Sequence, residues 1–195
     1  KGNKSKLFAP HSLISTMRAG ILCLGPLVAK YGSAVTAFPG GCILNGKSGR
    51  PINFHLDALK MLGMTYELKG GNIHAKSNGK LKGAKIRFKN ISVGASQQTI
   101  LSAVIAKGKT YLHNIALEPE VLELIKFLIL AGAKIKFIGK RSLMIEGVTS
   151  LNSINFNIMG DRIEAGTFSV LACLNQGKLE IKNFNPKHIK KEIEC

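Results

Sequence analysis

The sequence predicts an α/β fold built from a βαβαββ unit that repeats with a period of about 69 residues. Glycines that are expected to end helices recur at this spacing: Gly63 with Gly132, and Gly108 with Gly177. Ser92 and Asp161, whose side chains suit helix N-caps, are also 69 residues apart. This period is far longer than that of a solenoid, so the chain is expected to reuse one α/β unit within a larger fold.

The first copy alternates apolar helices and short strands. Pro26 should kink its first helix because proline removes a backbone donor, and Gly32 and Gly63 should end its helices. Gly70-Gly71 suits the tight turn of a hairpin. The expected elements, in order, are helix 16–30, strand 35–38, helix 55–62, and hairpin strands 64–68 and 72–76.

The second copy repeats this order, and a third begins after it. Ser92 should cap a helix that Gly108 ends, and Asp161 and Glu164 have capping-box spacing at the next start. The expected elements are strand 84–88, helices 95–107 and 118–130, strand 109–115, hairpin strands 133–138 and 142–146, then helix 166–175 and strand 178–183. We expect one domain over residues 1–159 and an incomplete second domain over residues 160–195.

The composition is that of a globular protein. Hydrophobic residues make up 45% of the 195, which is enough to bury a core. No apolar run approaches the ~18 residues of a membrane span. The basic residues 1–6 are not followed by the apolar stretch of a signal peptide. We therefore expect a soluble cytoplasmic protein without a membrane partner.

The formal net charge of +17 raises the alternative of a nucleic-acid or polyanion-binding module. Most of the cations are lysines scattered singly or in pairs, Trp is absent, and aromatic residues make up only 6%. This pattern lacks the stacking platforms of single-strand binders and favours a solvated surface. The alternative stays open, and it predicts nucleic-acid or polyanion binding that depends steeply on salt concentration.

The cysteines do not form a metal or disulfide framework. Cys23, Cys42, Cys173 and Cys195 include no CxxC pair and no Cys/His cluster with zinc spacing. Cys23 and Cys173 fall in apolar helical patterns and are expected to be core thiols. Cys42 lies in a loop with nearby cations, a setting that lowers a thiol pKa and favours thiolate chemistry.

The glycine-rich loop over residues 38–55 interrupts the first copy. Gly32 and Gly63 are 31 residues apart, whereas the equivalent Gly108 and Gly132 are 24 apart. The surplus of seven falls between a strand and a helix, where Cys42 lies. A long insertion can be neutral, but one that carries a cysteine and two cations in a reused scaffold indicates a functional loop.

Three helix starts are candidate anion sites. Thr16, Ser92 and Asp161 occupy equivalent positions, and Arg18 and Arg162 follow two of them. A helix N-terminus presents free N–H groups and a positive dipole end to an anion. The alternative for each position is an ordinary N-cap.

The repeat and its motifs resemble the enolpyruvyltransferase family, and the Pro-Gly-Gly-Cys loop is similar to that of its peptidoglycan branch rather than its shikimate branch. The matching stretches are Met17-Arg18-Ala19, Leu24 to Ala29, Pro39-Gly40-Gly41-Cys42, Gly49-Arg50-Pro51, Leu81 to Ala84, Ser92 to Ala95, Glu118-Pro119-Glu120 and Asp161 to Phe168. The resemblance implies an inside-out α/β barrel fold with two domains of three βαβαββ units each. This chain would be a truncated version of it.

The resemblance also implies an activity. The family branch transfers the enolpyruvyl group of phosphoenolpyruvate to the 3-hydroxyl of UDP-N-acetylglucosamine, the first committed step of peptidoglycan synthesis. These two molecules are the expected partners, and no cofactor or metal is expected.

The resemblance implies roles for particular residues. Cys42 matches the loop cysteine that acts as general acid, forms an adduct with phosphoenolpyruvate and is alkylated by fosfomycin. Arg50 matches an arginine that contacts phosphoenolpyruvate, and Arg18 one in the nucleotide-sugar site. The segments that match the uridine diphosphate contacts are Arg50, Pro51, Ile52, Asn53 and Phe54, and Asn90, Ile91, Ser92 and Val93.

The sequence departs from the family pattern in two positions and in extent. Asn53 stands where the family has Asp, and Asn90 where Lys is common. The N-terminal Lys-Asn pair and the second half with its catalytic Asp have no counterpart. The isolated chain is therefore expected to be inactive unless a complementary chain supplies the missing half. A decayed gene product is the further alternative.

Overall fold

The computed structural model of the protein describes residues 8–9, 11–14, 16–39, 43–44, 48–49 and 51–190. The chain divides into two compact units, residues 1–153 and residues 154–195. The segment 147–161 carries neither helix nor strand, and both this division and the domain boundary expected after residue 159 fall in it.

The first part of unit 1 is one βαβαββ copy. Its elements are β1 (Phe8–Ala9), α1 (His11–Ile14), η2 (Arg18–Cys23), α2 (Leu24–Tyr31), β2 (Ser33–Ala37), α3 (Asn53–Met61), β5 (Met64–Lys69) and β6 (Asn72–Ser77). They form a sheet of order β1-β2-β6-β5, in which β1 and β2 are parallel and the other neighbours antiparallel. A small hairpin, β3 (Ile43–Leu44) and β4 (Ser48–Gly49), lies in the connection between β2 and α3.

The second part of unit 1 repeats this topology. Its elements are β7 (Lys85–Arg87), α4 (Val93–Ala103), β8 (Lys109–His113), α5 (Pro119–Leu130), β9 (Lys134–Gly139) and β10 (Ser142–Glu146). The sheet order is β7-β8-β10-β9, again with the first pair parallel and the others antiparallel. The predicted βαβαββ repeat is confirmed.

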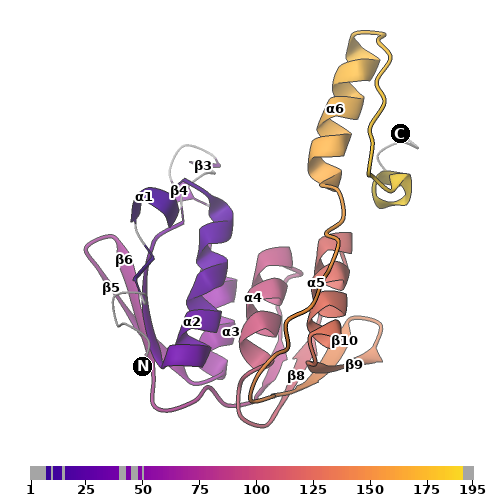
Figure 1. Ribbon diagram of the computed structural model, residues 1–195. Coiled ribbons are helices and arrows are strands. Elements are labelled where there is room, and N and C mark those ends of the chain that lie inside the picture. Colours follow the sequence, from indigo (N-terminus) through magenta and orange to yellow (C-terminus); the bar gives the residue numbers. More distant parts are fainter. Residues whose placement is uncertain are drawn as a thin grey trace. The chain divides into compact units, whose positions relative to one another are not determined.

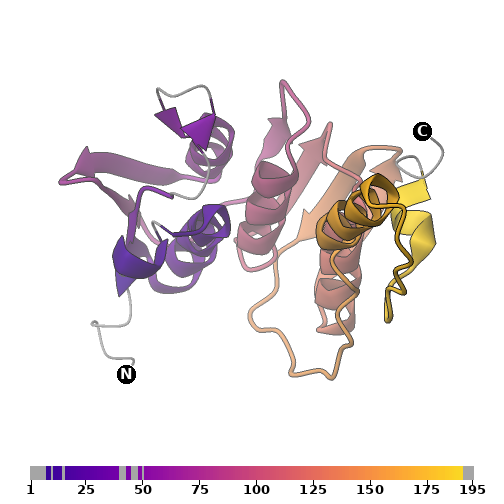
Figure 2. The ribbon, with the colours of Figure 1, turned by 90° about the horizontal axis from the view of Figure 1, so that it is seen from above.

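The central helix of unit 1 is α4, which packs against both α2 and α3. Figures 1 and 2 show α2, α3 and α4 side by side, with the first sheet against α2 and α3 and the second against α4 and α5. One apolar cluster runs through both copies, so the repeats share a core. Helix α4 is largely buried, and at Gly25 the α2 backbone approaches it so closely that a Cβ would lie 2.1 Å from Ser102 Oγ.

Three of the five expected glycines, Gly32, Gly63 and Gly132, end their helices, whereas Gly108 lies beyond the end of α4, whose C-cap is Val104. Gly32, Gly63, Gly108 and Gly132 all have φ between 83° and 98°, the left-handed conformation that glycine adopts without a steric cost. At the end of α6 (Arg162–Leu174), Gln176 takes this conformation with φ 48° instead of Gly177. The prediction for Gly177 was therefore wrong by one residue.

Three expected helices differ in extent, and the one expected over 166–175 begins four residues earlier, at Arg162. The segment expected as one kinked helix over 16–30 is a 3-10 helix, η2, followed by α2, and Pro26 lies in the first turn of α2. Proline is tolerated there because the first N–H groups of a helix have no partner within it. Helix α4 ends at Ala103, earlier than the predicted end at residue 107.

Unit 2 contains α6 and the 3-10 helix η3 (Pro186–Ile189). The strand expected over 178–183 does not form, because in the described residues of this unit no neighbouring strand offers it hydrogen bonds. Cys173, expected in the core, is exposed on α6. Its prediction fails because α6 buries little of its surface; among its residues Ala165 is buried. No helix in the described part of the chain is long and apolar enough to cross a membrane.

Candidate functional site

The candidate site of unit 1 lies where three helices begin. Arg18 is the first residue of η2, Asn53 the first of α3, and Val93 the first of α4. Helix α4 packs against α3 and η2, so these starts belong to one packed group. The predicted substrate-binding residues that the structure describes all lie at these starts.

Arg18 joins η2 to the segment before α3. Its Nη2 donates a hydrogen bond to the carbonyl oxygen of Pro51 at 2.9 Å. The charged guanidinium is thereby held beside the start of α3. Sequence reasoning placed Arg18 and Pro51 in one binding site, and the structure brings them into contact although they are 33 residues apart.

The segment from Pro51 to Phe54 presents alternating faces. Pro51 and Asn53 are exposed, whereas Ile52 is buried and Phe54 packs against the core. Helix α3 begins without a side-chain cap, since its N-cap residue is Ile52. Its first N–H groups therefore need partners from outside the helix. Only the exposed members of this segment can face a ligand without repacking the core.

The segment from Asn90 to Val93 leads into α4. Asn90 and Ile91 are exposed, and Ser92 caps the helix by accepting a hydrogen bond from Ala95 N–H at 3.3 Å. The N-cap prediction for Ser92 is confirmed. Val93 packs partly against the core, so the exposed pair Asn90 and Ile91 is the part of this segment open to solvent.

A buried histidine that the sequence reasoning missed links these starts. His55, in the first turn of α3, is 4% exposed, and its Nδ1 bonds to Oε1 of Gln98 on α4. Gln98 Nε2 donates in turn to the carbonyl oxygen of Ile21 in η2 at 2.9 Å. The available signal was the placing of a histidine and a glutamine on the inward faces of apolar helices.

The environment of His55 keeps its ring neutral. Burial lowers the pKa of His55, and the positive charge of Arg18 lowers it further, while the hydrogen bond with Gln98 opposes both. An uncharged imidazole is suited to a site next to a guanidinium and the positive end of a helix.

The other expected helix starts do not offer anion sites. Thr16 Oγ1 donates to Leu13 O at 2.8 Å and does not cap η2, whose N-cap is Met17. Asp161 caps α6 by accepting from Ile163 N–H at 2.7 Å and Glu164 N–H at 3.2 Å. Its carboxylate occupies that helix N-terminus and would repel an anion.

Cys42 and Arg50, the residues expected to act on phosphoenolpyruvate, lie outside the described residues. Among the described neighbours, Ile43 pairs with Gly49 and Leu44 with Ser48, as β3 and β4 of the same connection. Cys23 is a different kind of thiol. Its Sγ donates to Gly20 O at 2.8 Å, and burial raises the pKa of Cys23, so it is a poor nucleophile.

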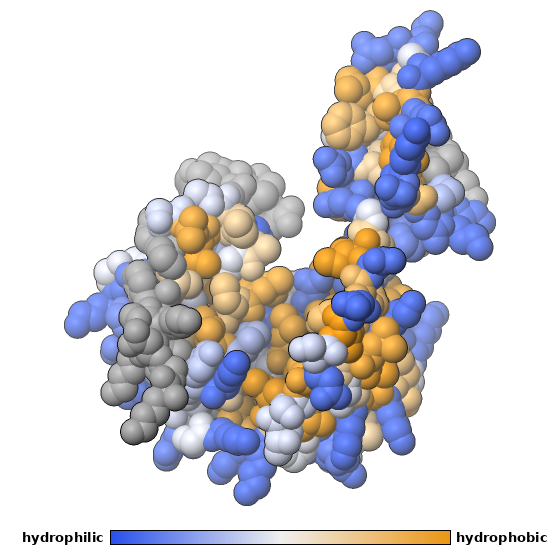
Figure 3. Space-filling model, viewed as in Figure 1, coloured by the Kyte–Doolittle hydropathy of each residue, from blue (hydrophilic) through white to orange (hydrophobic). Residues whose placement is uncertain are grey.

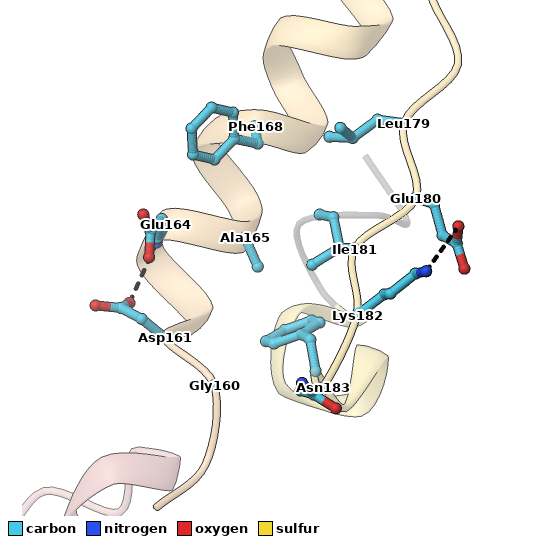
Figure 4. A pocket seen from close by; sticks show the side chains of 11 residues that line it. Gly160, Asp161, Glu164, Ala165, Phe168, Leu179, Glu180, Ile181, Lys182 and Asn183 are labelled. Carbon is cyan, nitrogen blue, oxygen red and sulfur yellow. Dashed lines mark hydrogen bonds and ion pairs between the residues drawn. The ribbon is translucent and has the colours of Figure 1, made fainter.

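Unit 2 has a pocket of about 430 Å³ between α6 and the segment 179–184 (Figure 4). Phe168, Leu179 and Ile181 form its apolar wall, and Asp161 and Glu164 stand at one end. Lys182 pairs with Glu180 at 3.8 Å, with both side chains exposed. None of the residues predicted to act in catalysis or to bind the substrates lies in this pocket. No group of three or more metal-ligating side chains occurs among the residues the structure places.

Comparison with known proteins agrees with this architecture. A family model described as EPSP synthase (3-phosphoshikimate 1-carboxyvinyltransferase) matches residues 1–194. The UDP-N-acetylglucosamine 1-carboxyvinyltransferase of Pelagibacter ubique (strain HTCC1062) is 47% identical over 190 residues, which are 97% of this chain and 45% of that protein. The enzyme of the same name from Shewanella baltica (strain OS155) is 42% identical over 191 residues, 98% of this chain and 45% of that protein.

Solved structures share the fold. The enolpyruvyl transferase NikO from Streptomyces tendae superposes with a TM-score of 0.67 at 24% identity, over 82% of this chain and 37% of that chain. EPSP synthase from Acinetobacter baumannii gives a TM-score of 0.62 at 18% identity, over 80% of this chain and 35% of that one. The chain thus spans about half the length of the curated relatives it matches.

Proposed function

This chain belongs to the EPSP synthase family of enolpyruvyltransferases, and from that premise we propose that it forms part of a UDP-N-acetylglucosamine 1-carboxyvinyltransferase. The complete enzyme would transfer the enolpyruvyl group of phosphoenolpyruvate to the 3-hydroxyl of UDP-N-acetylglucosamine and release phosphate. It would work in the cytoplasm, in the first committed step of peptidoglycan synthesis. The convergence of Arg18 and the starts of α3 and α4 is the observation that carries this proposal.

The converging starts suit the diphosphate of a nucleotide sugar. Two helix N-termini direct N–H groups and positive dipole ends to one region, and Arg18 adds a full positive charge beside them. Exposed Pro51, Asn53, Asn90 and Ile91 would line the uridine side, with the segments Arg50 to Phe54 and Asn90 to Val93 as its walls. The net charge of +17 would favour the approach of both anionic substrates.

Cys42 would deliver the proton of the transfer step. In that step the sugar hydroxyl would lose its proton to a base in the half that this chain does not span, its oxygen would bond to C2 of phosphoenolpyruvate, and C3 would take a proton. Cleavage of the bond between C2 and the phosphate oxygen, with loss of a C3 proton, would then release phosphate and restore the double bond. Cys42 would be the general acid and Arg50 would contact phosphoenolpyruvate. The raised pKa of Cys23 leaves it unsuited to this role.

The site would need the half of the enzyme that this chain does not span, whether that half lies on the same polypeptide or on another. The chain spans 45% of each of the two curated relatives, and its exposed apolar side chains support a further surface that covers them. Figure 3 shows apolar residues gathered over α5 and along α6. Those that are exposed include Leu122, Phe127, Ile129 and Leu130 on α5, and Ile163, Val170, Leu171 and Leu174 on α6. The chain by itself is expected to bind the nucleotide sugar but not to catalyse the enolpyruvyl transfer.

Calorimetric titration with UDP-N-acetylglucosamine tests the site. Arg18→Ala should weaken binding by about tenfold or more, because a charged hydrogen-bonding group contributes ~1.5–3 kcal/mol. Arg141→Ala is the matched control, since Arg141 Nη1 also donates to a backbone carbonyl, that of Ile115, at 2.9 Å, and Arg141 is not among the predicted substrate-binding residues. Equal weakening by both variants, or tighter and steeply salt-dependent binding of heparin, would favour a general polyanion binder instead.

A further inference from the structure

His55 and Gln98 form a hydrogen-bond chain that links three helices of unit 1. His55 belongs to α3, Gln98 to α4, and the carbonyl that Gln98 reaches belongs to Ile21 of η2. Both side chains are buried, with Gln98 fully so. A buried polar chain of this kind is stabilising only when each member is satisfied, so loss of one bond disturbs the others.

The hydrogen bonds fix the state of the ring. Because Gln98 uses its amide N–H to donate to Ile21 O, its Oε1 is the acceptor that faces His55. His55 Nδ1 therefore carries the proton, and the neutral ring leaves Nε2 as an acceptor. Gln98 and His55 thus determine each other's orientation.

The other edge of the ring meets the first turn of α4. A Cβ at Gly94 would lie 2.9 Å from His55 Cε1 and 3.1 Å from Nε2. Glycine at this position therefore lets the ring sit against the helix start that follows Asn90 to Val93. Through this contact the first turn of α3 lies against the first turn of α4.

From this geometry we propose that His55 and Gln98 are positioning residues that hold Arg18 and the segments 51–54 and 90–93 at the spacing that the nucleotide sugar requires. The proposal rests on the proposed function of the same site. His55 immediately follows one segment, and Gly94 follows the other. Gln98 fixes η2, whose first residue is Arg18. Neither His55 nor Gln98 is expected to contact the substrate itself.

The test compares two substitutions on α4. Gln98→Met keeps a similar volume and removes both hydrogen bonds of the chain. We expect it to raise the Kd for UDP-N-acetylglucosamine about tenfold. Thr99→Val is the control, because Thr99 is also fully buried but its hydroxyl donates to Ala95 O within the same helix. Thr99→Val should lower stability in urea yet leave the Kd within about twofold of the wild-type value, since it leaves the His55–Gln98 hydrogen-bond chain intact.

Two variants of His55 distinguish loss of the Nδ1 hydrogen bond from a change in core packing. His55→Asn retains a donor where Nδ1 lies and should bind close to the wild-type level. His55→Leu removes the donor and should behave as Gln98→Met does. Equal Kd values for Gln98→Met and Thr99→Val, or no recovery in His55→Asn relative to His55→Leu, would overturn the positioning role.

A ligand-free readout keeps this test apart from that of the proposed function. In amide NMR spectra, Gln98→Met should shift resonances in both segments, at Asn53 and Ile91 for example, whereas Thr99→Val should not. If the wild-type chain binds no UDP-N-acetylglucosamine, the proposed function fails for this chain, and the amide shifts still decide the positioning role. Identical shift patterns in the two variants would refute it.

Discussion

At the scale of single residues, the neutral state of His55 links stability to pH. Its pKa is lowered in the folded protein, so below the ordinary histidine pKa the unfolded chain binds the extra proton and the folded chain resists it. The contribution of neutral His55 to the free energy of unfolding should therefore be complete above about pH 6.5. This contribution should be lost as the pH drops from there through the lowered pKa of the folded state.

Urea denaturation between pH 7.5 and pH 5 measures this dependence. His55→Asn cannot titrate, so its stability should fall less steeply with acid than that of the wild type. Parallel pH profiles for the two proteins would mean that His55 is not held neutral by the fold.

Residue roles were only partly predictable from the sequence. Ser92 was identified as a cap because serine before an apolar helix has a local signature, and the structure confirms it. His55 and Gln98 lie 43 residues apart, and their bond depends on how α3 packs on α4. The sequence places each side chain on the inward face of an apolar helix, but it does not show that the two meet. The exposure of Cys173 likewise depends on which elements cover α6, and helical periodicity does not report that.

At the scale of elements, the approach of α2 to α4 depends on Gly25. A Cβ there would meet Ser102 Oγ at 2.1 Å and Leu59 Cδ2 at 2.9 Å, so Gly25→Ala should force the helices apart. We expect a loss of about 1–3 kcal/mol in the free energy of unfolding, measured in urea.

Gly139→Ala is the matched control in the same unit. A Cβ at Gly139 would lie 3.6 Å from Ser142 Cβ, an ordinary contact. Its substitution should change stability by less than about 1 kcal/mol. A cost at Gly25 no larger than that at Gly139 would contradict the close packing of α2 on α4.

The elements themselves were largely predictable because the sequence marks their ends. The hairpin of β5 and β6 follows from Gly70-Gly71, both of which have positive φ in the structure. The strand expected over 178–183 failed for a reason that lies outside its own residues. A strand forms only beside another strand, and apolar alternation does not say whether that neighbour is present.

At the scale of the whole molecule, the connection between the units should be the first site of cleavage. Segment 147–161 has no helix or strand, and Leu151 is 36% exposed. Phe127 is 38% exposed but lies within α5, where the helical backbone resists entry into a protease. Limited chymotrypsin digestion with mass analysis should therefore cut at Leu151 before Phe127, although chymotrypsin prefers phenylalanine. Earlier cleavage at Phe127 would show that α5 opens more readily than the connection.

The central claim is that this chain retains a working half of an enolpyruvyltransferase site. Intact-mass spectrometry after fosfomycin treatment, with and without UDP-N-acetylglucosamine, tests it most directly. We expect a single adduct that maps to Cys42 and forms faster when the nucleotide sugar is present, because the sugar would order the site around the thiol. Exposed Cys173 and part-buried Cys23 serve as internal controls. No adduct, or modification of Cys173 as extensive as that of Cys42, would contradict the claim and leave the family membership as a statement of ancestry.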